Sequence, residues 1–301
     1  MLFRSWDGPI LTDSGGFQVV SLGDLRAIDD DGVTFRSHLD GSLHRFTPEV
    51  AVGVQEALGA DIAVAFDQPV FPSSPRAVVA EATERTHRWA GRSLAAHARE
   101  DQAIFGIAQG GLEPDLREAS VRFIAGLPFD GICIGGLAGD ETPAQRGAAL
   151  DVAAAVLADD PRPRYLMGLG SPADLLEAVH RGVDLFDSVM PARVARNGQL
   201  WVPGGRLNIR NQRFLDDPGP IQEDCPCLAC RRFSRAYIAH LFRARELLGY
   251  RLATCHNLTF TLDFMARIRA AIRAGAFPAA MPGLRHRAGR VSASEGAEKS
   301  A

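Results

Sequence analysis

Short apolar runs recur along the chain, and each of them ends at a polar residue or a glycine. They occupy residues 10–12, 62–66, 104–108, 132–134, 165–167 and 185–186. The residues that follow them are Asp13, Asp67, Gln109, Gly135, Gly168 and Asp187. Runs this short and this uniformly apolar are typical of parallel strands that are buried on both faces.

Helical segments separate these runs. We expect helices over residues 48–58, 75–99, 114–125, 143–157 and 172–181, and several of them begin with a proline that follows Ser, Thr or Glu. Proline in the first helical position behind a capping residue marks a helix start. The alternation of strand and helix predicts an α/β fold with a parallel sheet. Two strands at 33–39 and 43–47, flanking Asp40-Gly41, predict a hairpin before the first helix.

Polar residues or glycines at the ends of six strand–helix units favour a TIM (β/α)8-type barrel. A doubly wound sheet would not normally place side-chain chemistry at the end of every strand. Only six of the eight strands are found, so we expect a barrel lacking its first two strands here. We expect residues 1–290 to form this incomplete barrel domain, with a subdomain at 216–275, and residues 291–301 to form a disordered tail.

Composition narrows the class of protein. The 301 residues are 46% hydrophobic, which is ample for a large core, and no run of 18 apolar residues could span a membrane. No apolar signal core follows Met1, so we expect a cytoplasmic protein. The net charge of −3 hides an asymmetry, because arginines dominate residues 193–290 and acidic residues dominate residues 1–192. The basic part predicts either a phosphate-binding face or a solvated charged surface.

Three of the five cysteines lie close together, at Cys225, Cys227 and Cys230, and a helical run is expected over 231–248 before His256. Three thiolates and one imidazole complete the tetrahedral shell of a zinc ion. Because all four ligands would come from the protein, the site would be structural. Cys255 is an alternative fourth ligand, and Cys133 is expected in the core.

Three carboxylates end predicted strands. Asp13 lies in the segment TDSGGF, whose two glycines allow close approach of a ligand, while Asp67 and Asp187 end two other runs. Each alone would equally fit a helix N-cap or a structural hydrogen bond. Together they fit a nucleophile, an acid/base and a ligand anchor, and glycosidic chemistry uses such pairs of carboxylates. A metal-hydrolase barrel would normally need histidines at strand ends, and none is found there.

Several longer motifs resemble those of one enzyme family. They are ILTDSGGFQ at 10–18, GIAQGG at 106–111, IGGL at 134–137, RYLMGLG at 164–170 and LFDSVMPARVARNG at 185–198. With the cysteine and histidine set, they make the chain resemble bacterial tRNA-guanine transglycosylases, the queuine tRNA-ribosyltransferases, from Gly8 to about Gly275. The family's ligand spacing selects His256 over Cys255 as the fourth ligand of one structural zinc ion.

The resemblance implies exchange of the wobble guanine of tRNAs with a GUN anticodon for a 7-deazaguanine, either queuine or 7-aminomethyl-7-deazaguanine. Asp187 matches the family's nucleophile, which forms a covalent bond to the ribose. Asp13 matches the acid/base that moves the proton on the base nitrogen. The resemblance also implies a homodimer, and it makes residues 216–275 a zinc-binding and RNA-contact subdomain.

Further residues match the family's ligand contacts. Asp67 would accept hydrogen bonds from the base, Gln109 and the Gly136 N–H would address its carbonyl oxygen, and Phe17 and Met167 would sandwich the ring. The positions matching base contacts are Asp13, Ser14, Gly15, Gly16, Phe17, Asp67, Gln109, Gly136, Leu137 and Met167. Those matching RNA contacts are Gly168, Leu169, Gly170, Ser171, Pro172, Ala173, Asp174, Ala192, Arg193, Val194, Ala195 and Arg196. Ala192 replaces the family's usual Thr, and ordinary core packing is the alternative for the apolar positions.

Two departures from the bacterial pattern concern the choice of base. Pro69 stands where bacterial members usually have Cys, and Gly139 stands where they usually have Val. Both predict a pocket enlarged beside the deazapurine side chain, and hence a chain that uses queuine. Drift in a loop that does not touch the ligand is the alternative.

Two other functions remain as rivals. Archaeal relatives act in the D-arm of tRNA but carry additional C-terminal RNA-binding domains, for which the sequence printed here has no room. A non-catalytic tRNA-binding or partner subunit, inactive because of the missing N-terminal strands, is the second. Such paralogues tend to lose the catalytic carboxylates, whereas Asp13 and Asp187 are both present.

Overall fold

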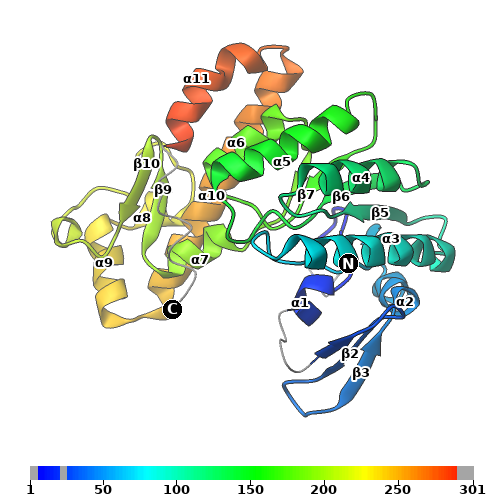
Figure 1. Cartoon of the computed structure of the whole chain (residues 1–301). Coiled ribbons are helices and arrows are strands. Elements are labelled where there is room, and N and C mark those ends of the chain that lie inside the picture. Colours follow the sequence, from blue (N-terminus) through cyan, green and yellow to red (C-terminus); the bar gives the residue numbers. More distant parts are fainter. Residues whose placement is uncertain (1–5, 21–25, 290–301) are drawn as a thin grey trace. The chain divides into compact units, whose positions relative to one another are not determined.

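The computed structural model describes residues 6–20 and 26–289, and Figure 1 traces its elements. The chain divides into two compact units. Within the described residues, the first unit comprises 6–167 and 181–185, and the second comprises 168–180 and 186–289. The tail predicted at 291–301 lies outside the described residues.

The first unit is built around a parallel sheet. Its five strands follow the order β4 (Ile62–Val64), β5 (Ala103–Ala108), β6 (Gly131–Ile134), β7 (Arg164–Leu166) and β8 (Leu185–Phe186), and the boundary between the units falls within β8. The segment predicted as the first strand runs parallel to β4 through a single bridge between Leu11 and Ile62. The N–H of Thr12 also donates to the Ile62 carbonyl at 3.0 Å. The α/β class and the order of the predicted strands are therefore confirmed, with the first strand reduced to a bridge.

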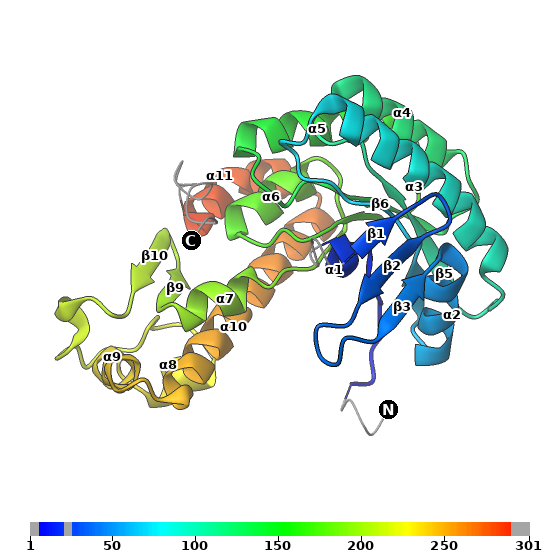
Figure 2. The ribbon, with the colours of Figure 1, turned by 60° about the horizontal axis from the view of Figure 1, so that its bottom comes forward.

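Helices cover this sheet from outside. They are α2 (Pro48–Leu58), α3 (Arg76–Ala96), α4 (Pro114–Ala125) and α5 (Pro143–Val156). Figure 2 shows α3, α4 and α5 side by side along the outer side of the strands. The predicted starts of α2 and α5 are confirmed. Thr47 caps α2 by accepting the Val50 N–H, and Thr142 forms a capping box with Gln145 at the start of α5.

The predicted hairpin is confirmed and lies beside the parallel sheet. Strands β2 (Val33–Arg36) and β3 (Leu43–Phe46) pair antiparallel, and β1 (Arg26–Ile28), which was not predicted, pairs with β2. A cluster of Val33, Ala51, Phe66 and Trp89 joins this small sheet to α2 and α3. A short helix, α1 (Gly16–Val20), follows Asp13 and was also not predicted.

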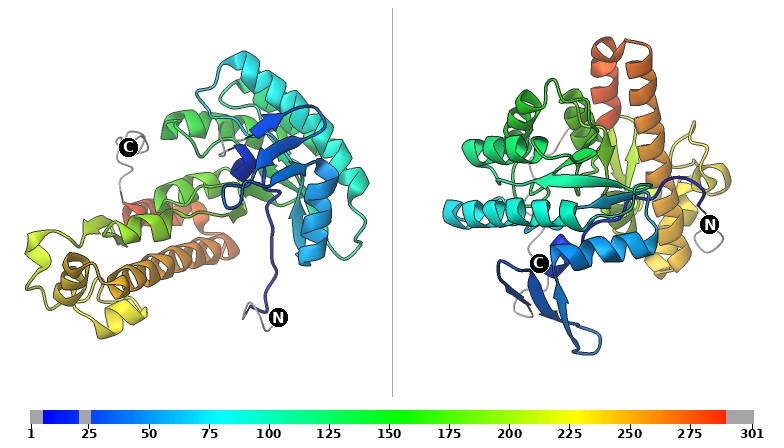
Figure 3. Two further views of the ribbon diagram at one scale, coloured as in Figure 1. Left: turned by 90° about the horizontal axis from the view of Figure 1, so that it is seen from below. Right: turned by 90° about the vertical axis from the view of Figure 1, so that its right-hand side faces the viewer.

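The second unit is mainly helical. Its elements are α6 (Pro172–His180), α7 (Met190–Arg196), β9 (Gln199–Val202), β10 (Gly205–Asn208), the 3-10 turn η2 (Gln212–Phe214), α8 (Leu228–Arg232), α9 (Arg235–Ala244), α10 (Leu247–Arg273) and α11 (Phe277–Ala288). Strands β9 and β10 form an antiparallel pair, and Figure 3 shows α11 folding back along α10. None of the helices in the described part of the chain is long and apolar enough to cross a membrane.

One expectation for this unit was wrong. The helical run predicted over 231–248 is interrupted twice, at Phe233 and at Arg245, which takes a left-handed φ of 58°. Leu247 then starts a 27-residue helix, so His256 lies inside α10 rather than after the end of a helix. The breaks turn the chain so that α8 and α10 can pack together.

Candidate active site and metal centre

Asp67 and Gln109 form a buried pair at the ends of neighbouring strands. Asp67 follows the end of β4 and Gln109 follows β5 directly, and the Gln109 Nε2 donates to Asp67 Oδ2 at 2.6 Å. Both side chains are nearly inaccessible to solvent. The Gln109 Oε1 is buried without a partner among the described residues, and a buried acceptor left in this state favours a ligand or water. The structure therefore brings together two of the residues that the sequence singled out.

Asp67 has an unusual protonation equilibrium. Burial and the negative charge of Asp13 raise the pKa of Asp67 to about 7, while the hydrogen bond from Gln109 acts in the opposite direction. The carboxyl group therefore changes between a donor and an acceptor near neutral pH. A buried carboxyl group with a raised pKa is typical of a functional site.

The glycine-rich segment after Asp13 lies directly against Asp67. A Cβ on Gly16 would lie 2.5 Å from Asp67 Oδ1 and 2.7 Å from its main-chain oxygen, so only glycine permits this approach. Gly15 adopts a left-handed φ of 87°, which turns the chain at this point. The Ser14 Oγ is buried and has no hydrogen-bond partner within residues 6–20 and 26–289, whereas Asp13 is exposed and accepts the Ser14 N–H at 2.8 Å.

Side chains from the outer helices hold the strand ends in place. The Ser93 and Thr86 hydroxyls of α3 accept the N–H groups of Phe66 and Gln68, which flank Asp67, at 3.2 and 3.0 Å. The Gln55 side chain of α2 binds both the N–H and the carbonyl of Val64 in β4. Gln55 Oε1 also accepts the Thr12 hydroxyl at 3.0 Å, which ties the Asp13 segment to the sheet.

The residues expected to sandwich the base have different environments. Phe17 lies on α1 and its side chain is 60% exposed. Met167 is half-buried and packs on the cluster that includes Ile107 and Cys133, while Leu137 is fully buried. Cys133 therefore lies in the core, as expected.

Gly139 does not open the space that the sequence predicted. A Cβ at this position would lie 2.5 Å from the Pro72 Cδ and 3.1 Å from its Cγ, because the buried Pro72 ring fills the volume beside the glycine. The Gly139 N–H is held by Glu141 at 2.8 Å. The argument from Gly139 for a pocket enlarged to take queuine is therefore wrong.

Asp187 lies in the second unit, just after β8. It is exposed, and its Oδ1 accepts the N–H of Gly168 at 2.7 Å. Gly170 packs so closely on Ser188 that a Cβ would lie 2.3 Å from the Ser188 Cβ. The loop that begins at Gly168 therefore orients the Asp187 carboxylate while leaving it accessible.

The two segments expected to contact RNA also lie in this unit. In the first, Ser171 Oγ donates to Asp174 Oδ2 at 2.6 Å at the start of α6. The second lies within α7, where Arg193 and Arg196 are exposed and Ala195 is buried. The structure thus leaves both guanidinium groups free to face solvent or a phosphate.

Cys225, Cys227, Cys230 and His256 form a group that could hold one metal ion. Their ligand atoms all lie within 4.8 Å of one another, and the three sulfur atoms lie 3.7, 3.7 and 3.3 Å from the His256 Nδ1. Zinc bonds of about 2.3 Å to sulfur and about 2.0 Å to nitrogen at a tetrahedral angle separate these atoms by about 3.5 Å. The donor set and its spacing fit the predicted structural zinc, and Cys255 lies outside the group.

The metal group is linked through α10 to α7, the helix in which RNA contacts are expected. The Nε2 of His256 lies 2.7 Å from the Trp201 carbonyl in β9, an arrangement that leaves Nδ1 as the metal ligand. The neighbouring Asn257 is fully buried and donates to the carbonyls of Pro191, in the first turn of α7, and of Gln199, the first residue of β9. A metal ion that holds α10 would therefore also position α7.

Several residues of this framework were missed by sequence reasoning. They are Gln55, Thr86, Ser93, Arg117, Ser120 and Asn257, all buried polar residues on helices. The available signal was a polar residue on the apolar face of an amphipathic helix, where a solvated side chain is not expected.

Comparison with known proteins places this chain in one family. The family model described as queuine tRNA-ribosyltransferase matches residues 2–287. A queuine tRNA-ribosyltransferase of Herpetosiphon aurantiacus is 55% identical over 90% of the chain and 69% of the relative. Those of Pelotomaculum thermopropionicum and Thermus thermophilus are 53% and 51% identical over 91% of the chain, and cover 74% and 71% of the relatives. The chain therefore belongs to the queuine tRNA-ribosyltransferase family.

Proposed function

We propose that this chain exchanges the wobble guanine of tRNAs with a GUN anticodon for a free 7-deazaguanine base. The buried pair of Asp67 and Gln109 is the observation that carries the proposal. An ionised Asp67 accepts two hydrogen bonds from the ring N–H and the exocyclic amine of guanine. The second N–H of the Gln109 amide and the Gly136 N–H then donate to the base carbonyl, which gives a complement to the donor–donor–acceptor edge of guanine.

Asp187 is the proposed nucleophile. Its carboxylate oxygen attacks the anomeric carbon of the ribose, the bond to the guanine nitrogen breaks, and its electron pair stays on that nitrogen. Asp13 supplies the proton that the departing base takes up. In the second half of the reaction Asp13 takes the N–H proton of the incoming base, whose nitrogen attacks the same carbon and releases Asp187. The Gly168 N–H keeps the exposed carboxylate in one orientation for this attack.

The second unit carries the proposed contacts to tRNA. Arg193 and Arg196 are exposed on α7 and can pair with phosphates or bases beside the wobble position. The residues from Gly168 to Asp174 contribute the other RNA contacts. The metal group would hold one structural zinc ion, which stabilises α8 and α10 and takes no part in the exchange. We further propose that the enzyme works in the cytoplasm as a homodimer.

Trapping the covalent intermediate tests this function. Denaturing electrophoresis of the enzyme with a GUN-anticodon tRNA should show a protein–tRNA adduct, and Asp187→Asn should remove it because an amide is a poor nucleophile. Asp184→Asn is the matched control. The Asp184 carboxylate accepts the main-chain N–H of Arg164 at 2.9 Å. The nucleophile assignment fails if the Asp187→Asn enzyme still forms the adduct. A wild-type enzyme that binds tRNA but neither forms an adduct nor incorporates a base would instead indicate a non-catalytic tRNA-binding subunit.

A further inference from the structure

Arg117 is a fully buried arginine whose partners are all main-chain carbonyl groups. Its Nη1 donates to Ala108 and Gly135 at 3.1 and 2.9 Å, and its Nη2 donates to Gly111 at 2.8 Å. Among the described residues no carboxylate forms an ion pair with it, and burial lowers the pKa of the guanidinium to about 10. It therefore stays charged at neutral pH. A buried charge without a counter-charge is costly, so its position calls for a function.

The first of these carbonyls belongs to the peptide group that carries Gln109. The Ala108 carbonyl accepts from Arg117, and the N–H of the same peptide group, that of Gln109, donates to the Ser120 Oγ at 3.0 Å. Arg117 and Ser120 both lie on α4, three residues apart and hence on the same face. Helix α4 therefore holds this peptide group at both its oxygen and its nitrogen, which fixes where the Gln109 side chain starts.

The second carbonyl belongs to the peptide group that carries the Gly136 N–H. No cis peptide bond occurs in the described part of the chain, so the Gly135 carbonyl and the Gly136 N–H point in opposite directions. The bond from Arg117 to Gly135 therefore sets the direction of this N–H. No acceptor among the described residues receives it, and Gly136 has a left-handed φ of 71° that lets the chain turn here. The N–H remains available to a ligand.

We propose that Arg117 is a positioning residue for base recognition. Arg117 donates hydrogen bonds to the Ala108 and Gly135 carbonyls. These bonds orient the Gln109 side chain and the Gly136 N–H toward the carbonyl oxygen of the base. Arg117 itself does not touch the base. This inference rests on the proposed function, because it assumes that these two donors address a guanine-like base.

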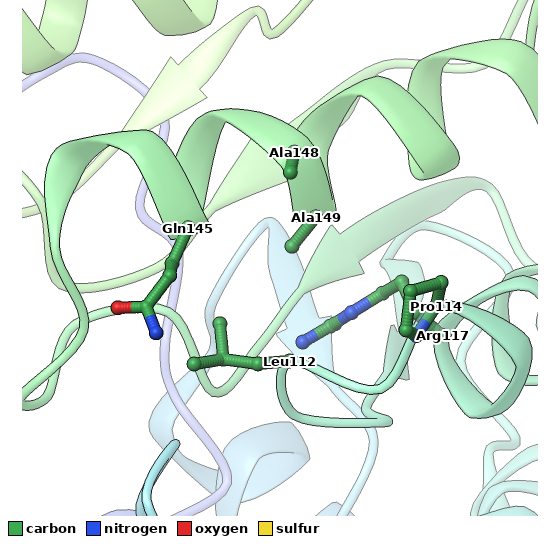
Figure 4. Close-up of a pocket in the computed structure, with 6 residues that line it drawn as sticks. All are labelled: Leu112, Pro114, Arg117, Gln145, Ala148 and Ala149. Atoms are coloured by element: carbon green, nitrogen blue, oxygen red, sulfur yellow. The ribbon is translucent and has the colours of Figure 1, made fainter.

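The surroundings of Arg117 offer a direct way to test the role of its guanidinium. A cavity of about 160 Å³ adjoins it, and Figure 4 shows Arg117 beside Leu112 and below the helix that carries Ala148 and Ala149. The Nε of Arg117 is buried and has no partner among the described residues. In an Arg117→Ala variant, a guanidinium ion from solution could enter through this cavity and replace the missing group.

The first experiment compares Arg117→Met with a matched control. Arg162 also donates to main-chain carbonyls, those of Leu127, Phe129 and Ala125, but these lie before the strands rather than at their carboxyl ends. Binding of free guanine is measured by calorimetry, and its KM is measured in the exchange assay. Arg117→Met should raise the Kd and KM of guanine about ten- to a hundred-fold, because two oriented donors lose their support. Arg162→Met should lower the melting temperature while leaving both constants unchanged.

The second experiment asks whether the chemical group itself restores binding. Millimolar guanidinium should lower the guanine Kd of Arg117→Ala toward the wild-type value, and should do nothing for Arg117→Met, whose side chain fills the space. Arg117→Lys keeps the charge, but its single nitrogen cannot replace both Nη1, which binds the Ala108 and Gly135 carbonyls, and Nη2, which binds the Gly111 carbonyl, so an intermediate Kd is expected.

The outcomes separate this inference from the proposed function. A wild-type protein that does not bind guanine contradicts the proposed function. A folded Arg117→Met or Arg117→Lys protein that binds guanine as wild type does overturns the positioning role. Equal losses of guanine affinity in the Arg117 and Arg162 variants, without rescue by guanidinium, would also overturn it, since they indicate general destabilisation.

Discussion

Asp67 is the residue whose surroundings most affect its chemistry. It is buried, it lies close to Gly16 and Asp13, and its pKa is raised to about 7. In the folded protein it therefore holds its proton up to a higher pH than in the unfolded chain. Between the pKa of the unfolded chain, near 4, and that of the folded protein, about 7, the folded state binds one more proton than the unfolded state. The contribution of Asp67 to the free energy of unfolding therefore decreases as the pH rises through that range.

The same equilibrium predicts a pH dependence for base binding. Only the ionised Asp67 can accept both donors of guanine, so the Kd of guanine should rise about tenfold for each pH unit below about 7 and stay constant above it. Calorimetric titration on both sides of neutrality measures this. Asp67→Asn should bind guanine weakly and without the pH dependence, while Asp61→Asn, at the opposite end of β4, serves as control. A guanine affinity of the wild type that is flat across neutral pH contradicts the assigned role.

The positions of Asp67 and Gln109 could be predicted because each follows an apolar run, and the ends of parallel strands meet at one edge of a sheet. Arg117 could not be predicted in this way. Its sequence neighbours read as an ordinary amphipathic helix, and its burial depends on carbonyl groups that only the folded strands bring to it. The lack of free space beside Gly139 was equally hidden, since Pro72 reaches it from another strand end.

At the level of elements, the outer helices act as supports for strand ends. The Thr86 and Ser93 hydroxyls of α3 accept main-chain N–H groups on either side of Asp67. The Ser120 hydroxyl of α4 accepts the main-chain N–H of Gln109. The helices thus do more than cover an apolar sheet. Their hydroxyl groups satisfy N–H donors that lie beyond the regular strand pairing, where an unpaired group would be costly.

Thr86→Val tests this support. The change removes the acceptor of the Gln68 N–H, so it should lower the free energy of unfolding by about 1–3 kcal/mol and raise the KM of the base. Thr83→Val is a close control, because Thr83 is also buried on α3 but its hydroxyl binds only its own helix, at the Val79 carbonyl. Chemical denaturation and steady-state kinetics give both numbers. Equal effects of the two substitutions on KM would argue against a specific role of Thr86.

The bounds of these helices were among the features that sequence could predict. Thr47 with Pro48 and Thr142 with Pro143 mark helix starts by local hydrogen bonding, which needs no tertiary contact. The breaks at Phe233 and Arg245 could not be predicted, because no proline or glycine marks them. They depend on the packing of α8 and α9 against α10.

At the scale of the whole molecule, the two units have separate cores. One cluster contains Val64, Phe105 and Cys133 of the first unit, and another contains Cys225, Cys227 and Leu252 of the second. Two metal ligands, Cys225 and Cys227, belong to the second cluster, and Cys230 packs against it. Loss of the metal should therefore affect the second unit first.

Zinc removal by a chelator, or Cys227→Ser, should unfold the region 225–256 and abolish tRNA binding. Binding of free guanine through Asp67 and Gln109 should persist, since both lie in the first unit. Filter binding with tRNA and calorimetry with guanine on the same preparation measure the two effects. Cys255→Ser should keep the metal, because Cys255 is not one of the four ligands. Normal tRNA binding by the metal-free protein would refute this prediction.

Buried hydroxyl groups of α3 and α4 accept the main-chain N–H groups of Phe66, Gln68 and Gln109. We therefore expect these protons to exchange for deuterium in heavy water only when a helix separates from the sheet, and not when a loop alone fluctuates. The surface that we propose binds the base should then open and close together with the core of its unit. A ligand arriving there finds its partners already in place, and little of the binding free energy is lost to ordering them.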